Sequence, residues 1–366
     1  MSPSDIGDPS PAVGTGGPRS RSDVIVESTA EYLRREHDRW AEFCREALLT
    51  HHGLHHIAHY VDRMYEFAVD ALADPALAEE VADISIDRLR AACRQAGQEL
   101  CYNMLCLNQD LQQLQSGDLI RIVLHGPKGA IICNRVIPGE YIVTLTRDSS
   151  AAYRPELPLP QVQAVQDADR VAADIVDHMR DAVSLGTQNP GGWSTSRPTG
   201  DTSTVNDVAP GLSQPVVVEV AGQQDHPLRE TCHGALSTTD LHYVAYIHHE
   251  HESGISADCL EDSALSRFFL LTTGAARRKI YHDLGRQFPV VARQLFQAVY
   301  PVIGGPLPRI VLDVEQGALY FYRLSAEDHL LGVTLNQRRV SHTDDKMARL
   351  ARTAQMELGY ATSLDS

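Results

Sequence analysis

Two stretches of this 366-residue chain, far apart in the sequence, repeat the same pattern. Residues 121–135 read RIVLHGPKGAIICNR and residues 309–323 read RIVLDVEQGALYFYR, so Arg-Ile-Val-Leu, Gly-Ala and the closing Arg recur at identical spacing. Each stretch is a pair of apolar, β-favouring runs around a short turn, which indicates an antiparallel hairpin. Gly129 and Gly317 fall at the same point of the turn, where a residue without a Cβ atom can take a positive φ. We therefore predict two copies of one strand–turn–strand unit.

The repeat continues beyond the hairpin. Residues 143–145 and residues 333–335 both read Val-Thr-Leu, which predicts a third strand in each copy. The offset between the two copies is 188 positions at Arg121 and Arg309, and 190 positions at Val143 and Val333. The second copy therefore has two additional residues in the loop before its third strand, and loops tolerate such insertions. Apolar residues at helical spacing precede and follow each meander. We predict that the two meanders superpose, with the same strand order and hand.

Composition and charge exclude several classes of protein. The formal net charge is −16, which argues against binding to nucleic acid or to anionic membranes, because both require basic surface. No apolar run reaches the roughly 18 residues of a membrane-spanning helix, and the N-terminus lacks the apolar core of a signal peptide. The seven cysteines include no CxxC pair, which favours buried, reduced thiols. We predict a cytoplasmic protein.

The pattern divides the chain into four parts. Residues 1–22 are predicted to be a disordered tail, and residues 23–186 a helical extension followed by the first strand–helix domain. In that extension we predict helices from about residue 23 to 75, broken at Gly53. Residues 187–214 are rich in Gly, Pro, Ser and Thr and are predicted to be a linker. Residues 215–366 form the second domain, and the fold class is α+β.

The second domain resembles a known family. Its predicted order is a hairpin (LHYVAYIHHEHESGISADCL), a helix, a meander (RIVLDVEQGALYFYRLSAEDHLLGVTLNQ) and a closing helix (TDDKMARLARTAQMEL). This order is similar to that of the roadblock/LC7 domain, a profilin-like fold with helices packed on one five-stranded antiparallel sheet. Most members of the family are not enzymes; they dimerise and act as scaffolds or regulators of small GTPases. The resemblance therefore implies that this chain carries a built-in pseudo-dimer.

The first domain departs from that pattern, because we predict two helices where the first hairpin should be. Either it is a degenerate copy, or the shared meander belongs to another α+β sandwich.

Two histidine clusters could bind a metal. The first contains His51, His52, His55, His56 and His59, and the second, His248, His249 and His251, lies beside two glutamates. Imidazoles four residues apart on a helix can bind Zn²⁺ or Ni²⁺. We favour solvated or interface histidines for the first cluster and a polar hairpin tip for the second, and we assign no metal ligand.

A run of three basic residues, Arg277, Arg278 and Lys279, lies on a predicted helix of this acidic chain. Such a patch can contact an acidic partner or a phosphate, and we predict these three residues as partner contacts. The alternative is a solvated face that balances neighbouring acids. No GxxxxGK[ST], GxGxxG or GxSxG motif is present, so we assign no catalytic residue and no cofactor.

We predict a non-enzymatic cytoplasmic regulator or scaffold that binds a partner protein, such as a small GTPase. One alternative is a small-molecule or metal-sensing module. Another is an enzyme of a specialised bacterial pathway whose active-site residues converge only in three dimensions. A pocket lined by convergent polar side chains would favour these alternatives, and a shallow apolar face would favour the scaffold. Homo-oligomerisation is left open.

Overall fold

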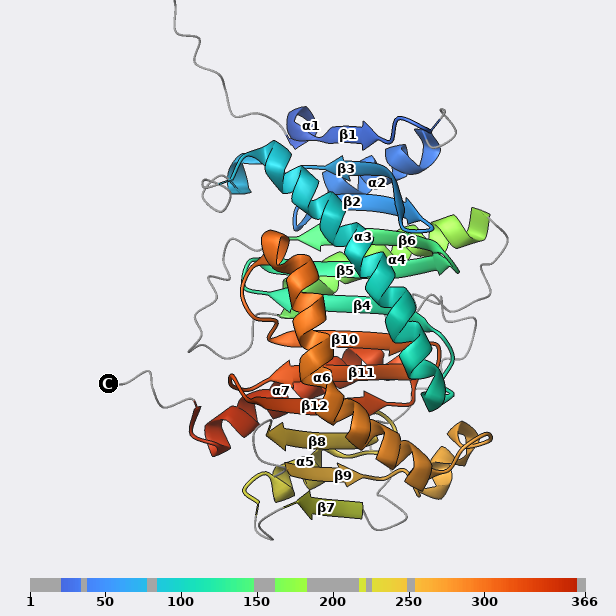
Figure 1. The fold of residues 1–366 in the computed structure, drawn as a ribbon, viewed down its shortest axis with the longest axis vertical. Coiled ribbons are helices and arrows are strands. Elements are labelled where there is room, and N and C mark those ends of the chain that lie inside the picture. The colour runs from blue at the N-terminus through green and yellow to red at the C-terminus, as the bar shows by residue number, and fades with distance from the viewer. Residues whose placement is uncertain are drawn as a thin grey trace, which may run out of the picture.

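A computed structural model describes residues 21–33, 38–77, 84–147, 162–182, 217–221, 226–248 and 254–360. Its strands form one twelve-stranded sheet in the order β1-β3-β2-β6-β5-β4-β10-β11-β12-β8-β9-β7 (Figure 1). The strands of the first half are β1 (Val26–Thr29), β2 (Leu54–Val61), β3 (Met64–Asp70), β4 (Leu119–Gly126), β5 (Gly129–Ile137) and β6 (Glu140–Thr146). Those of the second half are β7 (Val217–Ala221), β8 (Tyr243–His248), β9 (Gly254–Asp258), β10 (Arg309–Val314), β11 (Gly317–Arg323) and β12 (Asp328–Thr334).

The helices cover both faces of the sheet. The two longest, α3 (Ile86–Leu111) and α6 (Gly274–Ile303), cross one face (Figure 1). The opposite face carries α2 (Asp38–Thr50), α4 (Val162–Ala182), α5 (Arg229–Ala235) and α7 (Val340–Glu357). The remaining elements are α1 (Arg21–Val24) and the 3-10 turns η1 (Pro75–Leu77), η2 (Gln112–Leu114), η3 (Ser263–Phe268) and η4 (Gln337–Arg339). The chain is therefore a mixed α+β protein, as predicted.

The two predicted meanders have the same strand order. Strands β4, β5 and β6 are antiparallel neighbours, and so are β10, β11 and β12. Gly129 and Gly317 open the equivalent strands β5 and β11 with φ of 127° and 114°. A Cβ atom at either position would collide with the carbonyl oxygen of Thr146 or Thr334. The prediction of a repeated hairpin with equivalent turn glycines is confirmed.

The helices predicted from about residue 23 to 75 are wrong over Val26–Thr29, which form β1, and again between Gly53 and residue 75. Strands β2 and β3 form an antiparallel hairpin there, which corresponds to β8 and β9 in the second half. All of β2 except Val61 is buried, because helices pack on both of its faces, so the strand shows no alternation of apolar and polar residues. The first half therefore contains the hairpin that we predicted to be missing.

Strands β4 and β10 join the halves into one sheet. They pair antiparallel, with Val123 opposite Val311, Arg121 opposite Asp313 and His125 opposite Arg309. Since the paired segments are the repeated sequences themselves, Val123 and Val311 lie on a local pseudo-twofold axis. One apolar core beneath α3 and α6 contains residues of both halves. The described parts of the predicted domains thus share a sheet and a core.

Polar interactions repeat at the same offset as the sequence. Arg90 of α3 forms an ion pair with Asp70 at the end of β3, with Nε–Oδ2 and Nη2–Oδ1 distances of 2.9 and 3.1 Å. Arg278 of α6 pairs with Asp258 at the end of β9 through the same atoms, at 2.5 and 2.9 Å. Each pair lies 188 positions from its counterpart. The repeat therefore includes the contacts that attach each long helix to its own hairpin.

A pair of buried histidines repeats as well. The backbone N–H of Arg147, just after β6, donates to His55 Nδ1 over 3.0 Å. The N–H of Leu335, just after β12, donates to His242 Nδ1 over the same distance. Burial lowers the pKa of both imidazoles to about 4, so each is neutral and its Nδ1 can accept a hydrogen bond.

The predicted tail and linker lie largely outside the described residues. Residues 1–20 and the whole linker, 187–214, are among those that the structure does not describe, whereas Arg21 and Ser22 begin α1. Within the described ranges, no helix combines the length and apolarity that crossing a membrane requires.

Candidate functional site

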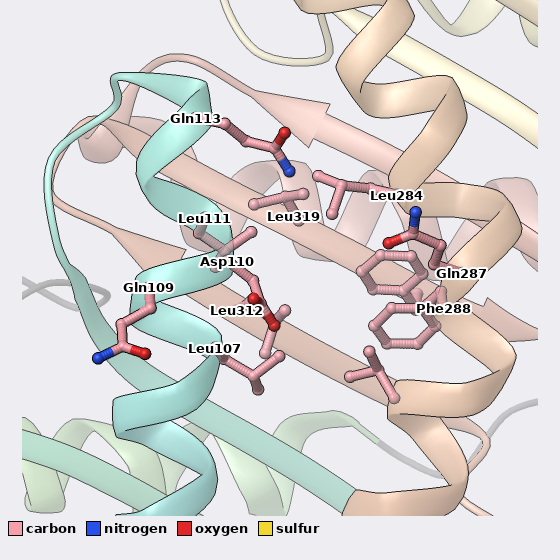
Figure 2. A pocket seen from close by; sticks show the side chains of 12 residues that line it. Leu107, Gln109, Asp110, Leu111, Gln113, Leu284, Gln287, Phe288, Leu312 and Leu319 are labelled. Carbon is pink, nitrogen blue, oxygen red and sulfur yellow. The ribbon is translucent and has the colours of Figure 1, made fainter.

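A groove lies between α3 and α6, and strands β10 and β11 form its floor (Figure 2). Its cavity measures about 370 Å³. Most of its lining is apolar: Leu107 and Leu111 from α3, Leu284, Phe288 and Val291 from α6, and Leu312, Leu319 and Phe321 from the floor. Gln109, Asp110, Gln113 and Gln287 form a polar rim. Because α3 belongs to the first half and α6 to the second, the groove exists only where the two halves meet.

The packing of α6 on the sheet shapes this groove. Gly285 faces β8 so closely that a Cβ atom would collide with Ile247, so the helix approaches the sheet at that point. Pro289 follows within the helix and cannot donate the backbone hydrogen bond expected there, which favours a bend. Between them, Phe288 points into the groove and stacks on Phe321 of β11.

The polar groups that line the groove are one carboxyl group and three amides. Among the described residues that line it, Asp110 is the one with an ionisable side chain. In nucleophilic catalysis the nucleophile is activated by an adjacent general base, and the neutral amides of the rim cannot act as one. The apolar floor and polar rim are suited to bury the apolar side of another molecule.

The predicted partner contacts do not form one exposed patch. Arg277 is only 1% exposed, donates to the Gln115 carbonyl oxygen over 3.3 Å and lies over the ring of Phe269. Arg278 is held by the ion pair with Asp258, and only Lys279 is exposed. The interpretation of these three residues as a joint basic surface is therefore wrong. Consecutive helix positions lie about 100° apart, so they cannot share one face.

A different set of basic residues does share a face of α6. Lys279, Arg286 and Arg293 are all exposed and follow one another at steps of seven residues. Seven residues are close to two helical turns of about 3.6 residues each, so these side chains align along the helix. We call them the basic crest. At about 100° per residue, these side chains lie about 80–160° around α6 from Gln287 and Val291, so the basic crest points away from the groove that those two residues line.

Three of the five histidines of the first cluster are buried, contrary to the prediction of solvated side chains, whereas His51 and His52 are exposed. His55, His56 and His59 are buried in β2, and burial lowers the pKa of His55 and His56 to about 4. His59 differs, because its Nδ1 and Nε2 lie 2.9 Å from carboxylate oxygens of Glu66 and Glu140. These carboxylates outweigh the effect of burial and raise its pKa.

The second histidine cluster lies partly in residues 249–253, outside the described part of the chain. His248 Nδ1 lies 2.6 Å from Asp328 Oδ1. Asp328 also accepts hydrogen bonds from Tyr246, Ser325 and Tyr360. Burial alone would raise the pKa of Asp328, but these hydrogen bonds outweigh burial and lower the pKa to about 2. Within the described residues, no group of three or more His, Cys, Asp or Glu side chains is arranged to hold a metal ion.

A buried ionic cluster lies at the pseudo-twofold axis. Arg121 contacts Asp169 of α4 and, with Nη2–Oδ2 at 2.5 Å, Asp313 of β10. Arg309, the counterpart of Arg121, pairs with Asp344 of α7. We call these five residues the seam cluster. They lie in the interior between the sheet and α4 and α7, where a substrate has no access, and they attach the two halves to each other and to their closing helices.

Comparison with known proteins assigns no family. No family model matches the chain, and no curated protein matches it significantly. Sequence reasoning missed the groove and two of the three residues of the basic crest. The spacing of Lys279, Arg286 and Arg293 was the available signal for the crest, whereas the groove depends on how two distant helices pack.

Proposed function

We propose that this protein is a non-enzymatic regulator or scaffold that binds a partner protein in the groove between α3 and α6. The observation that carries this proposal is an apolar groove with a polar rim, built jointly by the two halves. Exposed apolar side chains lie along both helices, including Tyr102 and Leu105 of α3 and Val290 of α6. Exposed apolar groups beside a groove favour protein contacts.

The pairing of two similar halves supports the same function. Each half contributes six antiparallel strands, and five of them, the hairpin and the meander, correspond to the five-stranded sheet that a resemblance to roadblock domains implies. We propose a small GTPase as the partner on that basis. We also propose a cytoplasmic location, since all seven cysteines lie in the described residues and are free thiols, six of them buried.

Site-specific photo-cross-linking tests this function. A photoreactive phenylalanine analogue replaces Gln287 on the groove rim or, as a control, Arg349, which is exposed on α7 on the opposite face. The proposal predicts a discrete cross-linked protein from the native cytoplasm at position 287 and none at position 349. The captured protein, once purified, should bind the unmodified chain saturably, and Gln287→Trp should weaken that binding by filling the groove.

The enzyme alternative gives a different result. If position 287 captures no protein, and a screen of metabolites instead gives saturable turnover, the scaffold function is wrong.

A further inference from the structure

We infer that a pocket between η3 and η4 binds the phosphate group of a small organic phosphate monoester through Arg267 and Arg338. We call it the η3–η4 pocket. It shares no lining residue with the groove between α3 and α6, so this inference does not rest on the proposed function.

The η3–η4 pocket lies at the carboxyl ends of β10 and β12 (Figure 1). Three segments that are distant in the sequence form it: the end of η3, the turn between β10 and β11, and the segment that leads from β12 into η4. Its cavity measures about 460 Å³. Cavities of roughly 300–1,000 Å³ are typical of sites for small molecules, so the pocket has room for more than a bare phosphate ion.

Two arginines provide the positive charge that an anion requires. Arg267 of η3 and Arg338 of η4 both line the pocket and are exposed to solvent. Within the described ranges, neither side chain forms an ion pair with a carboxylate. The guanidinium carbon of Arg267 lies 4.6 Å from the centre of the Phe268 ring, which also lines the pocket. This contact with the ring favours a position of Arg267 at the pocket wall.

One acidic residue, Glu315, also lines the pocket. Its Oε1 lies 3.6 Å from Nη2 of Arg135, which is outside the pocket and offsets part of the negative charge. A buried arginine lies behind the wall: Arg277 donates to the carbonyl oxygen of Gln115, and the next carbonyl along the chain accepts from the N–H of Gln316, a lining residue. The positive charges at this pocket therefore outnumber the negative ones.

A buried amide offers a further donor. Gln337 lines the pocket and is only 9% exposed. Its Oε1 accepts the backbone N–H of Gly317 over 3.0 Å, which fixes the orientation of the amide. Its Nε2 has no hydrogen-bond partner in the part of the chain that the structure describes. A buried donor without a partner is unfavourable, and an oxygen of a ligand in the pocket would satisfy it.

This set of donors fits a phosphate better than a carboxylate. A carboxylate has two oxygens, and a single arginine can engage both of them. A phosphate monoester presents three terminal oxygens, so it can accept from Arg267, Arg338 and the Gln337 amide at the same time. Its fourth oxygen carries the organic group, and the remaining cavity beside Phe268 and Leu335 can accommodate that group.

Isothermal titration calorimetry of the full chain tests this inference. The probes are glycerol 3-phosphate, inorganic phosphate and succinate, each at pH 7.5 and at constant ionic strength. We expect glycerol 3-phosphate to bind saturably at one site, and at least about tenfold more tightly than succinate. Inorganic phosphate should compete for the same site but bind more weakly, because it leaves the space for the organic group empty.

Variants of the full chain locate the binding site. Arg267→Gln with Arg338→Gln removes two exposed charges and should weaken binding of glycerol 3-phosphate at least about tenfold. Gln337→Glu keeps an oxygen that can accept from Gly317 but replaces the free N–H donor with a second acceptor, so it should weaken binding as well.

Two controls accompany these variants. Arg349→Gln with Arg352→Gln removes two exposed arginines of α7 that do not line the pocket, and should change binding less than about twofold. Gln287→Trp fills the groove between α3 and α6 and should leave phosphate binding unchanged. Far-UV circular dichroism verifies that each variant is folded.

Four results would overturn the inference. They are no saturable binding of glycerol 3-phosphate, equal binding to the wild type and the double variant of Arg267 and Arg338, binding of succinate as tight as that of glycerol 3-phosphate, and tighter binding of inorganic phosphate than of the ester. Because the groove and the η3–η4 pocket are tested by different variants, failure of this inference leaves the proposed function intact.

Discussion

The seam cluster contains one carboxylate more than its arginines can balance. Arg121 and Arg309 face Asp169, Asp313 and Asp344, and all five side chains are nearly inaccessible to solvent. Burial, with smaller effects of Asp169 and Asp344, raises the pKa of Asp313 to about 7 against the opposing effect of Arg121. We therefore predict that Asp313 is the surplus carboxyl group, and that it is largely protonated in the folded protein below neutral pH.

Two substitutions separate this surplus carboxyl from an essential one. Asp313→Asn places a neutral group where the folded protein already favours one, and should change the free energy of unfolding by less than about 1 kcal/mol at pH 6. Asp344→Asn removes the ion-pair partner of Arg309, which faces the neutral His125 across the strand pair. Leaving a buried arginine uncompensated should cost about 3–5 kcal/mol.

The pH dependence gives a sharper test. Because the pKa of Asp313 is higher in the folded state than the ordinary value near 3.9, the folded state binds more protons between these two pH values, and stability falls as pH rises. The slope is at most about 1.4 kcal/mol per pH unit, so the wild type should lose about 2 kcal/mol relative to Asp313→Asn between pH 5 and pH 7. Other titrating groups cancel in this comparison.

Urea denaturation of the wild type and both variants at pH 5, 6, 7 and 8 measures these differences. Parallel pH profiles for the wild type and Asp313→Asn, or equal losses for Asp313→Asn and Asp344→Asn at pH 6, would show that the surplus carboxyl is assigned to the wrong residue.

Further substitutions test other parts of the structure. Leu350→Ala should cost about 2–4 kcal/mol, because Leu350 is buried where α7 packs on the sheet; a denaturant midpoint like that of the wild type would show that it does not pack there. Arg278→Met and Arg90→Met should each lower the free energy of unfolding by a similar amount, because each leaves a buried aspartate unpaired. If denaturant unfolding shows a large loss of stability for only one of them, the two arginines do not have equivalent roles. Glu66 and Glu140 raise the pKa of His59, so its contribution to stability is greatest below the unfolded pKa near 6.5 and is lost as pH rises through the folded value. His59→Gln should therefore destabilise most at acidic pH, and a loss independent of pH would contradict this assignment.

The sequence predicts the two meanders of the repeat, but it does not predict the β2–β3 hairpin. The meanders are visible because Gly129 and Gly317 separate short runs rich in Ile and Val. The β2–β3 hairpin is hidden because its turn, Asp62-Arg63, takes positive φ values of 47° and 67° without a glycine. Such a turn lacks the usual local signal, and the histidines of β2 are buried only because helices cover both faces of the sheet.

The candidate site was harder to predict from sequence. Arg277, Arg278 and Lys279 are adjacent in the sequence, but which of them is exposed depends on the rotation of α6 against the sheet. Spacing along a helix is the better guide, since residues seven apart share a face and consecutive residues do not. The groove has no local signal at all, because its walls come from helices that are distant in the chain.

Hydrogen–deuterium exchange of the full chain, with and without the protein captured at position 287, measures where the partner binds. If the groove is the binding site, added protection should be confined to the facing segments of α3 and α6, around residues 107–113 and 284–291, while α4 and α7 exchange as before. Protection on α4 and α7, with no change in α3 and α6, would place the partner on the opposite face and contradict the proposed binding site.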